Sequence, residues 1–336
     1  MTNNFLNAAK LFALGGFLCL GASGLAQGVA DPALDHWNHI VTSNTLTAEG
    51  KLPFYLKVEF QVFDLQGKPG ETGTAEVWWA PHHQYEVIAS PSWNQTSGQP
   101  YQPRTRQAYL IQALIGQIMQ PMWSFHISPA LKTVEADKKF GSTVLRCVTI
   151  NPPVSGSSDT TFCVEPPNNM LRTSFEVGAT VMRNKMGTFH DTFVSLDLTT
   201  VYGANKAITG KVVALKAIAP DDDHFKILPE PSVLKDAPRM PVSSGVLSGR
   251  KIGGSAPVYP SLARQNHLRG TVVIGALISK EGKITSQTVI ASPDPSLADA
   301  AVEAVRTWKY QPYLLNGQPT EVDTTILVNF SINGQP

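Results

Sequence analysis

Two stretches near the end of the chain decide its fold: Trp-Lys-Tyr-Gln-Pro at residues 308–312 and Val-Asp-Thr-Thr-Ile-Leu-Val-Asn-Phe-Ser-Ile at residues 322–332. In the second stretch Val322, Ile326, Val328 and Phe330 share one side of an extended chain, and polar residues fill most of the other side. This period of two is typical of a strand with one buried face. We therefore expect a long terminal strand.

The residues before these stretches predict the rest of a small domain. Pro260 opens a short helix over 261–265, and strands are expected over 271–278 and 283–291 with a turn at Gly282. A second helix follows, for which Ser296 and Asp299 form a capping-box pattern. Its apolar residues recur at helical spacing: Leu297, Ala300, Ala301, Ala304, Val305 and Trp308. The predicted order is helix, strand, strand, helix, strand.

These residues give the segment from 250 to 333 a resemblance to the C-terminal domain of the TonB family. The matching residues are Pro257-Val258-Tyr259-Pro260 with Ala263, Gly270-Thr271-Val272-Val273, Gly282, Ala300-Ala301 with Val305, Trp308-Lys309-Tyr310-Gln311-Pro312, and Ile326-Leu327-Val328-Asn329-Phe330. The resemblance implies a three-stranded antiparallel sheet with two helices. It also implies a function, because proteins of this family bind a short peptide of an outer-membrane transporter as a strand added to the terminal strand.

The peptide-binding residues implied by the resemblance lie on the terminal strand and at the Tyr-Pro pair. They are Tyr259, Pro260, Thr324, Thr325, Ile326, Leu327, Val328, Asn329, Phe330 and Ser331. Three strands leave an open edge whose N–H and C=O groups accept another extended chain, which supports such a role. Two alternatives stay open: the aromatic residues fill the core, or a second copy of the domain covers the edge as a homodimer.

The beginning of the chain departs from the TonB pattern. Energy-coupling TonB proteins retain a membrane helix with a functional histidine, whereas the apolar stretch from Leu11 to Ala26 contains no histidine. It follows Lys10 and ends in the small residues Gly24-Leu25-Ala26, as in a cleaved signal peptide, and is shorter than the roughly 20 residues of a spanning helix. We expect a signal peptide over 1–26 and a periplasmic protein, with a membrane-anchored form as the alternative.

Export leaves two cysteines in an oxidising compartment. Cys147 and Cys163 lie in two β-rich runs that are separated by a turn-like segment. We predict that they form a disulfide, worth roughly 3 kcal/mol if unstrained. Two unpaired buried thiols are the alternative.

Residues 27–219 predict a curved antiparallel sheet with a helix, so that the whole chain is of the α+β class. Phe54, Leu56, Val58 and Phe60 alternate with polar residues, and residues 104–119 have a helical apolar face that ends before a proline. The region resembles, more faintly, the half-barrel of LolA-like lipoprotein carriers. That resemblance implies a hollow for a lipid or another apolar ligand, which these side chains would line: Phe54, Phe60, Trp78, Trp79, Ile115 and Trp123. An ordinary core is the alternative.

A proline-containing linker is predicted over 220–250, before the TonB-type domain at 251–336. In an extended form it would reach on the order of 90 Å, which predicts two separate units. The 336 residues suffice for both, since 42% are hydrophobic.

Charge and motifs exclude several functions. The net charge of +1 gives no field that would concentrate nucleic acid. No phosphate loop, zinc, redox or esterase motif occurs, so we expect neither an enzyme nor a cofactor. His82-His83 and Asp221-Asp222-Asp223-His224 lack the spacing of a metal site, and we expect both to be solvated.

Overall fold

A computed structural model describes residues 32–81, 83–97, 105–122, 132–151, 160–226, 240–241, 250–315 and 317–332 of the chain. The predicted signal peptide lies outside these residues. Within the part described, every helix is too short or too polar to cross a bilayer.

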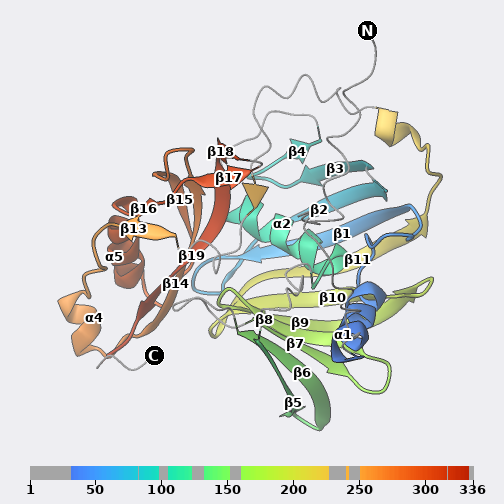
Figure 1. The fold of residues 1–336 in the computed structure, drawn as a ribbon, viewed down its shortest axis with the longest axis horizontal. Coiled ribbons are helices and arrows are strands. Elements are labelled where there is room, and N and C mark those ends of the chain that lie inside the picture. Colours follow the sequence, from blue (N-terminus) through green and yellow to red (C-terminus); the bar gives the residue numbers. More distant parts are fainter. Residues whose placement is uncertain are drawn as a thin grey trace, which may run out of the picture.

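An eleven-stranded, strongly curved sheet forms the N-terminal domain (Figure 1). All neighbouring strands in it are antiparallel. Their order across the sheet is β4 (Gln95–Thr96), β3 (His83–Ala89), β2 (Pro69–Ala80), β1 (Phe54–Phe63), β11 (Asn205–Ala217), β10 (Thr192–Tyr202), β9 (Ala179–Phe189), β8 (Met170–Glu176), β7 (Thr160–Glu165), β6 (Thr143–Asn151) and β5 (Lys132–Phe140).

Two helices pack on the hollow face of this sheet. Helix α2 (Arg106–Met119) lies across β1, β10 and β11, and helix α1 (Pro32–Ser43) packs near β6 to β8 (Figure 1). The Thr105 side chain caps α2 by accepting a hydrogen bond from the N–H of Ala108, and the helix ends where Gln120 precedes Pro121. The alternating residues of β1 are buried against α2 in one cluster, as the sequence predicts.

The C-terminal domain is built on three long antiparallel strands in the order β19 (Val322–Phe330), β14 (Gly270–Ile278) and β15 (Ile284–Ala291). The two-residue strand β12 (Met240–Pro241), from the predicted linker, adds to β19 in parallel. Helices α4 (Ser261–Gln265) and α5 (Pro295–Arg306) complete the predicted order. Two short pairs flank them: β13 (Lys251–Gly253) with β16 (Lys309–Tyr310), and β17 (Tyr313–Leu315) with β18 (Gln318–Thr320).

The start of α5 differs from the expected capping box. The helix begins two residues earlier, at Pro295, and Asp294 is its N-cap instead of Ser296; the Asp294 carboxylate accepts the N–H of Ser296 at 2.9 Å. Proline at the first helical position needs no hydrogen-bond partner for its nitrogen, which favours this earlier start.

One hydrophobic cluster contains residues of both domains. The cluster around α2 includes Val273, Ile290 and Ala291 of the C-terminal sheet, and Leu327 packs against it. At the turn between β8 and β9, a Cβ atom added to Gly178 would lie 3.2 Å from Val273. Despite the length of the linker, the C-terminal sheet therefore packs directly on the N-terminal domain, as Figure 1 shows for the orange and red strands.

Candidate functional site

Strand β19, which contains most of the predicted peptide-binding residues, has two very different edges. Along one edge it pairs with β14 over nine residues, from Val322 to Phe330. Along the other edge β12 pairs with Val322 and Asp323 alone. Among the residues that the structure describes, no strand pairs with this second edge from Thr325 to Phe330. Its backbone groups are therefore positioned to receive another strand.

The side chains of β19 alternate between two covered faces. Thr324, Ile326, Val328 and Phe330 are buried on the side of α5, and the last three belong to the core of the C-terminal domain. This agrees with the alternative that Phe330 is a core residue. Thr325 and Leu327 point the other way, toward α2. From Thr325 to Leu327, β19 can therefore contact a peptide only through its backbone.

Two residues of α2 make the polar contacts between the domains. The hydroxyl groups of Tyr109 and Thr325 share a hydrogen bond of 2.8 Å. Arg106 donates from Nε to the carbonyl of Ile290 at 2.7 Å and from Nη1 to the carbonyl of Phe63. Burial lowers the pKa of Arg106 from its ordinary value.

Sequence reasoning missed these contact residues. Tyr109 reads as one apolar position of a helix face. Arg106 carries a weak signal, because a cation in the first turn of a helix opposes the helix dipole unless another group stabilises it.

Tyr259 and Pro260 lie at the far end of β19. The ring of Tyr259 packs edge-on against Phe330 at 5.4 Å between ring centres, and its hydroxyl donates to the carbonyl of Leu268. Pro260 is the N-cap residue of α4. Asn329 is exposed and accepts a hydrogen bond from Thr271, and Ser331 is exposed just beyond the strand. The structure thus brings the Tyr-Pro pair next to the end of the predicted site.

The predicted disulfide between Cys147 and Cys163 is present. The two residues face each other on β6 and β7. They lie next to Leu145 and Phe175, near the β5 end of the sheet.

The apolar side chains that were predicted to line a hollow do not all lie on the same face of the sheet. Phe54, Phe60, Trp79 and Ile115 are buried in the cluster around α2, which favours the core interpretation. The prediction for Trp78 is wrong. Consecutive residues of a strand point to opposite faces of the sheet, so Trp78 lies on the outer face while its neighbour Trp79 lies on the hollow face. On the outer face Trp78 stacks on His224 at 4.0 Å. Trp123 lies outside the described residues.

The acidic run before His224 is partly ordered. It leads into the short 3₁₀ helix η1 (Asp223–Lys226), and Asp222 contacts the His224 ring at 2.6 Å while Asp223 is exposed. The expectation of a fully solvated segment is thus wrong for His224, since the ring finds an aromatic partner. In the part of the chain described, no three metal-binding side chains come together; His82 lies outside it.

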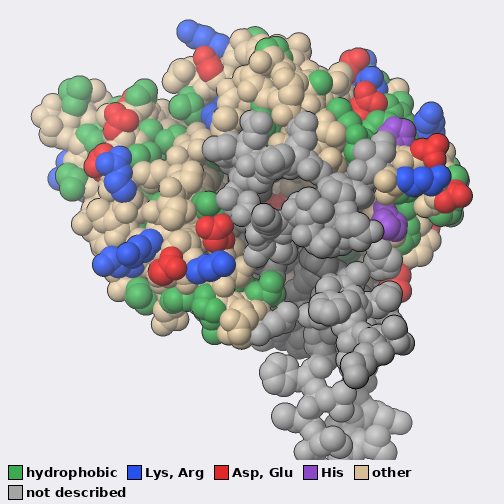
Figure 2. Space-filling view, turned by 90° about the horizontal axis from the view of Figure 1, so that it is seen from above, with side chains coloured by type: hydrophobic (Ala, Val, Ile, Leu, Met, Phe, Trp, Pro, Cys, Tyr) green, Lys and Arg blue, Asp and Glu red, His purple; other side chains and the backbone are tan. Residues whose placement is uncertain are grey.

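Charge on the surface is mixed in sign. Figure 2 shows Lys and Arg side chains interspersed with Asp and Glu over the face seen from above. This distribution agrees with the net charge of +1.

Comparisons with known proteins identify the C-terminal domain. The family described as Gram-negative bacterial TonB protein C-terminal matches residues 255–332. Protein TonB of Vibrio cholerae serotype O1 is 32% identical over 79 residues, which are 23% of this chain and 32% of that relative. The match thus spans about a third of the length of the curated relative.

Solved structures are similar to the N-terminal part at a low level. A DUF1329 family protein from Desulfovibrio piger has 7% identity and a TM-score of 0.39, covering 60% of this chain and 96% of that one. A LolA superfamily protein from Nitrosomonas europaea has 7% identity and a TM-score of 0.35, covering 56% and 96%. Likenesses this small say nothing about ligands. The similarity to a known family rests on the other end of the chain, where residues 255–332 match the TonB C-terminal family.

Proposed function

We propose that this chain binds an extended peptide of an outer-membrane transporter, or of another envelope protein, by strand addition to β19. The role is non-enzymatic and supports transport across the outer membrane. The supporting observation is the edge of β19 from Thr325 to Phe330, which no described strand covers. No charged residue occurs in this stretch, so nothing in it repels an added strand.

The proposed site is a backbone edge with polar and aromatic ends. β12 limits the edge at Asp323, and the Tyr259–Phe330 pair limits it at the other end. About six residues of edge remain, from Thr325 to Phe330, which suits a short peptide segment. Main-chain hydrogen bonds would supply much of the affinity, as is usual for strand addition.

We further propose that the protein works in the periplasm, after cleavage near residue 26. The disulfide between Cys147 and Cys163 supports an oxidising compartment. We retain 27–219, 220–250 and 251–336 as the proposed domain boundaries. N-terminal sequencing of the mature protein from the soluble periplasmic fraction tests this placement, and an intact Met1 in the inner membrane would contradict it.

Peptides with methylated backbone nitrogens test strand addition without altering the protein. Synthetic peptides from the N-termini of outer-membrane transporters are titrated into the full chain. Methylation at alternate positions should abolish binding in one register and leave it intact in the other, because only every second N–H of a strand points to its neighbour. Equal binding of all methylated peptides would show that side chains alone hold the peptide.

A variant of β19 tests the same edge from the other side. Val328→Pro removes one backbone N–H and should abolish peptide binding if this N–H faces the peptide. Val328→Ala keeps the N–H and is the matched control for the loss of core contacts around this buried side chain. Normal binding by a folded Val328→Pro chain would count against the edge. A dimer in light scattering that peptide does not dissociate would assign the edge to a second copy instead.

A further inference from the structure

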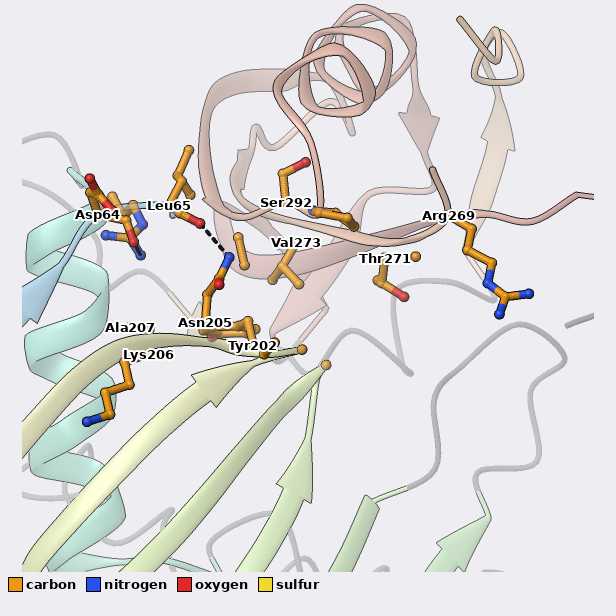
Figure 3. A pocket seen from close by; sticks show the side chains of 17 residues that line it. Asp64, Leu65, Tyr202, Asn205, Lys206, Ala207, Arg269, Thr271, Val273 and Ser292 are labelled. Atoms are coloured by element: carbon orange, nitrogen blue, oxygen red, sulfur yellow. Dashed lines mark hydrogen bonds between the residues drawn. The ribbon is translucent and has the colours of Figure 1, made fainter. Parts of the chain in front are cut away.

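A cavity of about 570 Å³ lies where the two domains meet (Figure 3). The N-terminal domain contributes the turn after β1, with Asp64, and the turn between β10 and β11, with Tyr202 and Asn205. The C-terminal domain contributes β14, with Thr271 and Val273, and the end of β15. Its volume falls in the range of small-molecule sites, which often form at domain interfaces.

The cavity is separate from the proposed peptide edge. The cavity lies against β14 and the end of β15. The proposed peptide edge is the edge of β19 that faces away from β14. In Figure 3 the side chains of Val273 and Ser292 lie on one side of the space, and those of Tyr202 and Asn205 lie on the other. Any molecule held there would contact both domains.

Positive charge predominates in its walls. Three cations line the cavity, Arg106, Lys206 and Arg269, against one carboxylate, Asp64. Within the described part of the chain none of the three cations forms an ion pair. The Asp64 carboxylate is already engaged, because Oδ1 accepts the N–H groups of Gln66 and Lys68 at 2.9 and 2.8 Å.

The three cations differ in how free they are to bind a ligand. Arg106 is tied to carbonyl oxygens and supplies positive potential. Lys206 and Arg269 are exposed and lie at opposite ends of the cavity in Figure 3. Lys206 lies 5.8 Å from the ring centre of Phe63.

Tyr202 provides a hydrogen-bond donor between these ends. Tyr202 is one of the residues that line the cavity. Burial raises the pKa of Tyr202 well above its ordinary value, so that the hydroxyl keeps its proton at neutral pH.

We propose that this cavity binds a small organic anion that carries a carboxylate or phosphate group. Arg269 and Lys206 hold the anionic group or groups, and the Tyr202 hydroxyl donates a hydrogen bond to the ligand. Since the lining residues come from both domains, the ligand stabilises their packing, and its binding requires that packing.

Calorimetric titration of the full chain with succinate, glycerol 3-phosphate and inorganic phosphate tests the proposal. We expect one saturable site for at least one of these probes, with a Kd below about 1 mM, and a rise in melting temperature at saturation. Preference for succinate or for the two phosphates distinguishes carboxylate from phosphate recognition. Arg269→Gln and Lys206→Gln should each weaken binding about tenfold, as expected for the loss of a charge-assisted contact.

Lys280→Gln is the matched control. It removes the same charge from an exposed residue in the turn between β14 and β15, which does not line the cavity, and it should leave binding unchanged. Three results would overturn the proposal: no saturable binding of any probe up to about 10 mM, equal weakening by Lys280→Gln, or unchanged affinity in both cavity variants. None of these measurements involves the β19 edge, so they leave the peptide-binding proposal untouched.

Discussion

Strand β5 and the part of strand β19 beyond its pairing with β12 both lie at sheet edges, but only β5 is protected by charge. In β5 every described side chain from Thr133 to Phe140 is exposed, and Glu135, Asp137, Lys138 and Lys139 place charges of both signs along the edge. In β19 the stretch from Thr324 to Phe330 has no charge. Charged edges discourage strand addition, whereas a long uncharged edge invites it. The charges of β5 therefore disfavour the addition of another strand to the N-terminal sheet, whereas β19 carries no such charges.

The opposite edge of the N-terminal sheet is protected in another way. Strand β4 has only two residues, and next to it Glu86 of β3 lies opposite Val77, on the hollow face. Short edge strands and inward-pointing charges both hinder the addition of a further strand. Both edges of the N-terminal sheet thus have features that hinder the addition of another strand.

Loss of the disulfide should have the largest effect on stability, and the effect should be confined to the N-terminal sheet. Replacing both Cys147 and Cys163 by serine should lower the free energy of unfolding by about 3 kcal/mol, measured by urea denaturation, because the unfolded chain gains freedom. Hydrogen exchange should rise in β5 to β7 and stay unchanged in β19. The reduced wild-type chain is the control and should match the variant. Faster exchange in β19 would mean that the two edges are not independent.

Leu327→Ala tests how firmly the open strand is fixed to the N-terminal domain. The side chain packs against the cluster around α2, so we expect a loss of about 2 kcal/mol in urea unfolding, at the low end of the usual cost. Leu314→Ala is the matched control, since Leu314 is 52% exposed and its loss should change stability by less than about 0.5 kcal/mol. Similar losses in both variants would disprove tight packing at Leu327.

Glu86→Gln tests the guarded edge at β3. Burial raises the pKa of Glu86 to about 7. The folded chain therefore holds a proton that the unfolded chain releases near pH 4.5, and stability falls as the pH rises from there through 7. The variant should lose this dependence and gain between about 1 and 2 kcal/mol at pH 8, since the side chain is only half-buried. Denaturation from pH 4 to pH 8 measures it.

The control for this pH dependence is Glu59→Gln. Glu59 is exposed on β1, so its replacement should leave the stability profile unchanged. If the free energy of unfolding of Glu86→Gln depended on pH in the same way as that of Glu59→Gln and the wild type, burial of Glu86 would not be the cause of the pH dependence.

The smallest expected effect comes from adding one charged residue to the proposed peptide edge of β19. Asn329→Lys places one charge on β19, as in β5, and should weaken peptide binding about threefold without changing stability. Asn329→Gln keeps an amide there and should bind as the wild type does. Fluorescence anisotropy with a labelled transporter peptide measures both, and tighter binding by the lysine variant would refute the comparison.

Alternation and local motifs were sufficient for most of the fold. The period of two in β1 and β19, the helix before Pro121 and the turn at Gly282 each depend on neighbours in the sequence, and the structure confirms them. The pairing of Cys147 with Cys163 followed from two adjacent strand-like runs, and the structure confirms it too. The cap of α5 was predicted wrongly, because two capping patterns overlap and only Asp294 reaches the open N–H groups.

The candidate sites were less predictable. The sequence indicates that Trp78 and Trp79 point to opposite faces of the sheet. It does not indicate which face is the hollow one, because curvature is a property of the whole sheet. The cavity is lined by residues about 200 positions apart, such as Asp64 and Thr271, and no local pattern links them.

Periodicity and short-range contacts are enough to predict which residues share a face, which strands resemble a TonB-type domain and which cysteines pair. What covers each face became clear only from the folded chain: α2 lies against Thr325 and Leu327, and a cationic cavity forms where the domains meet. The physical reason is that a strand encodes an apolar or polar face without encoding its partner. Only burial of that face against another part of the molecule selects one.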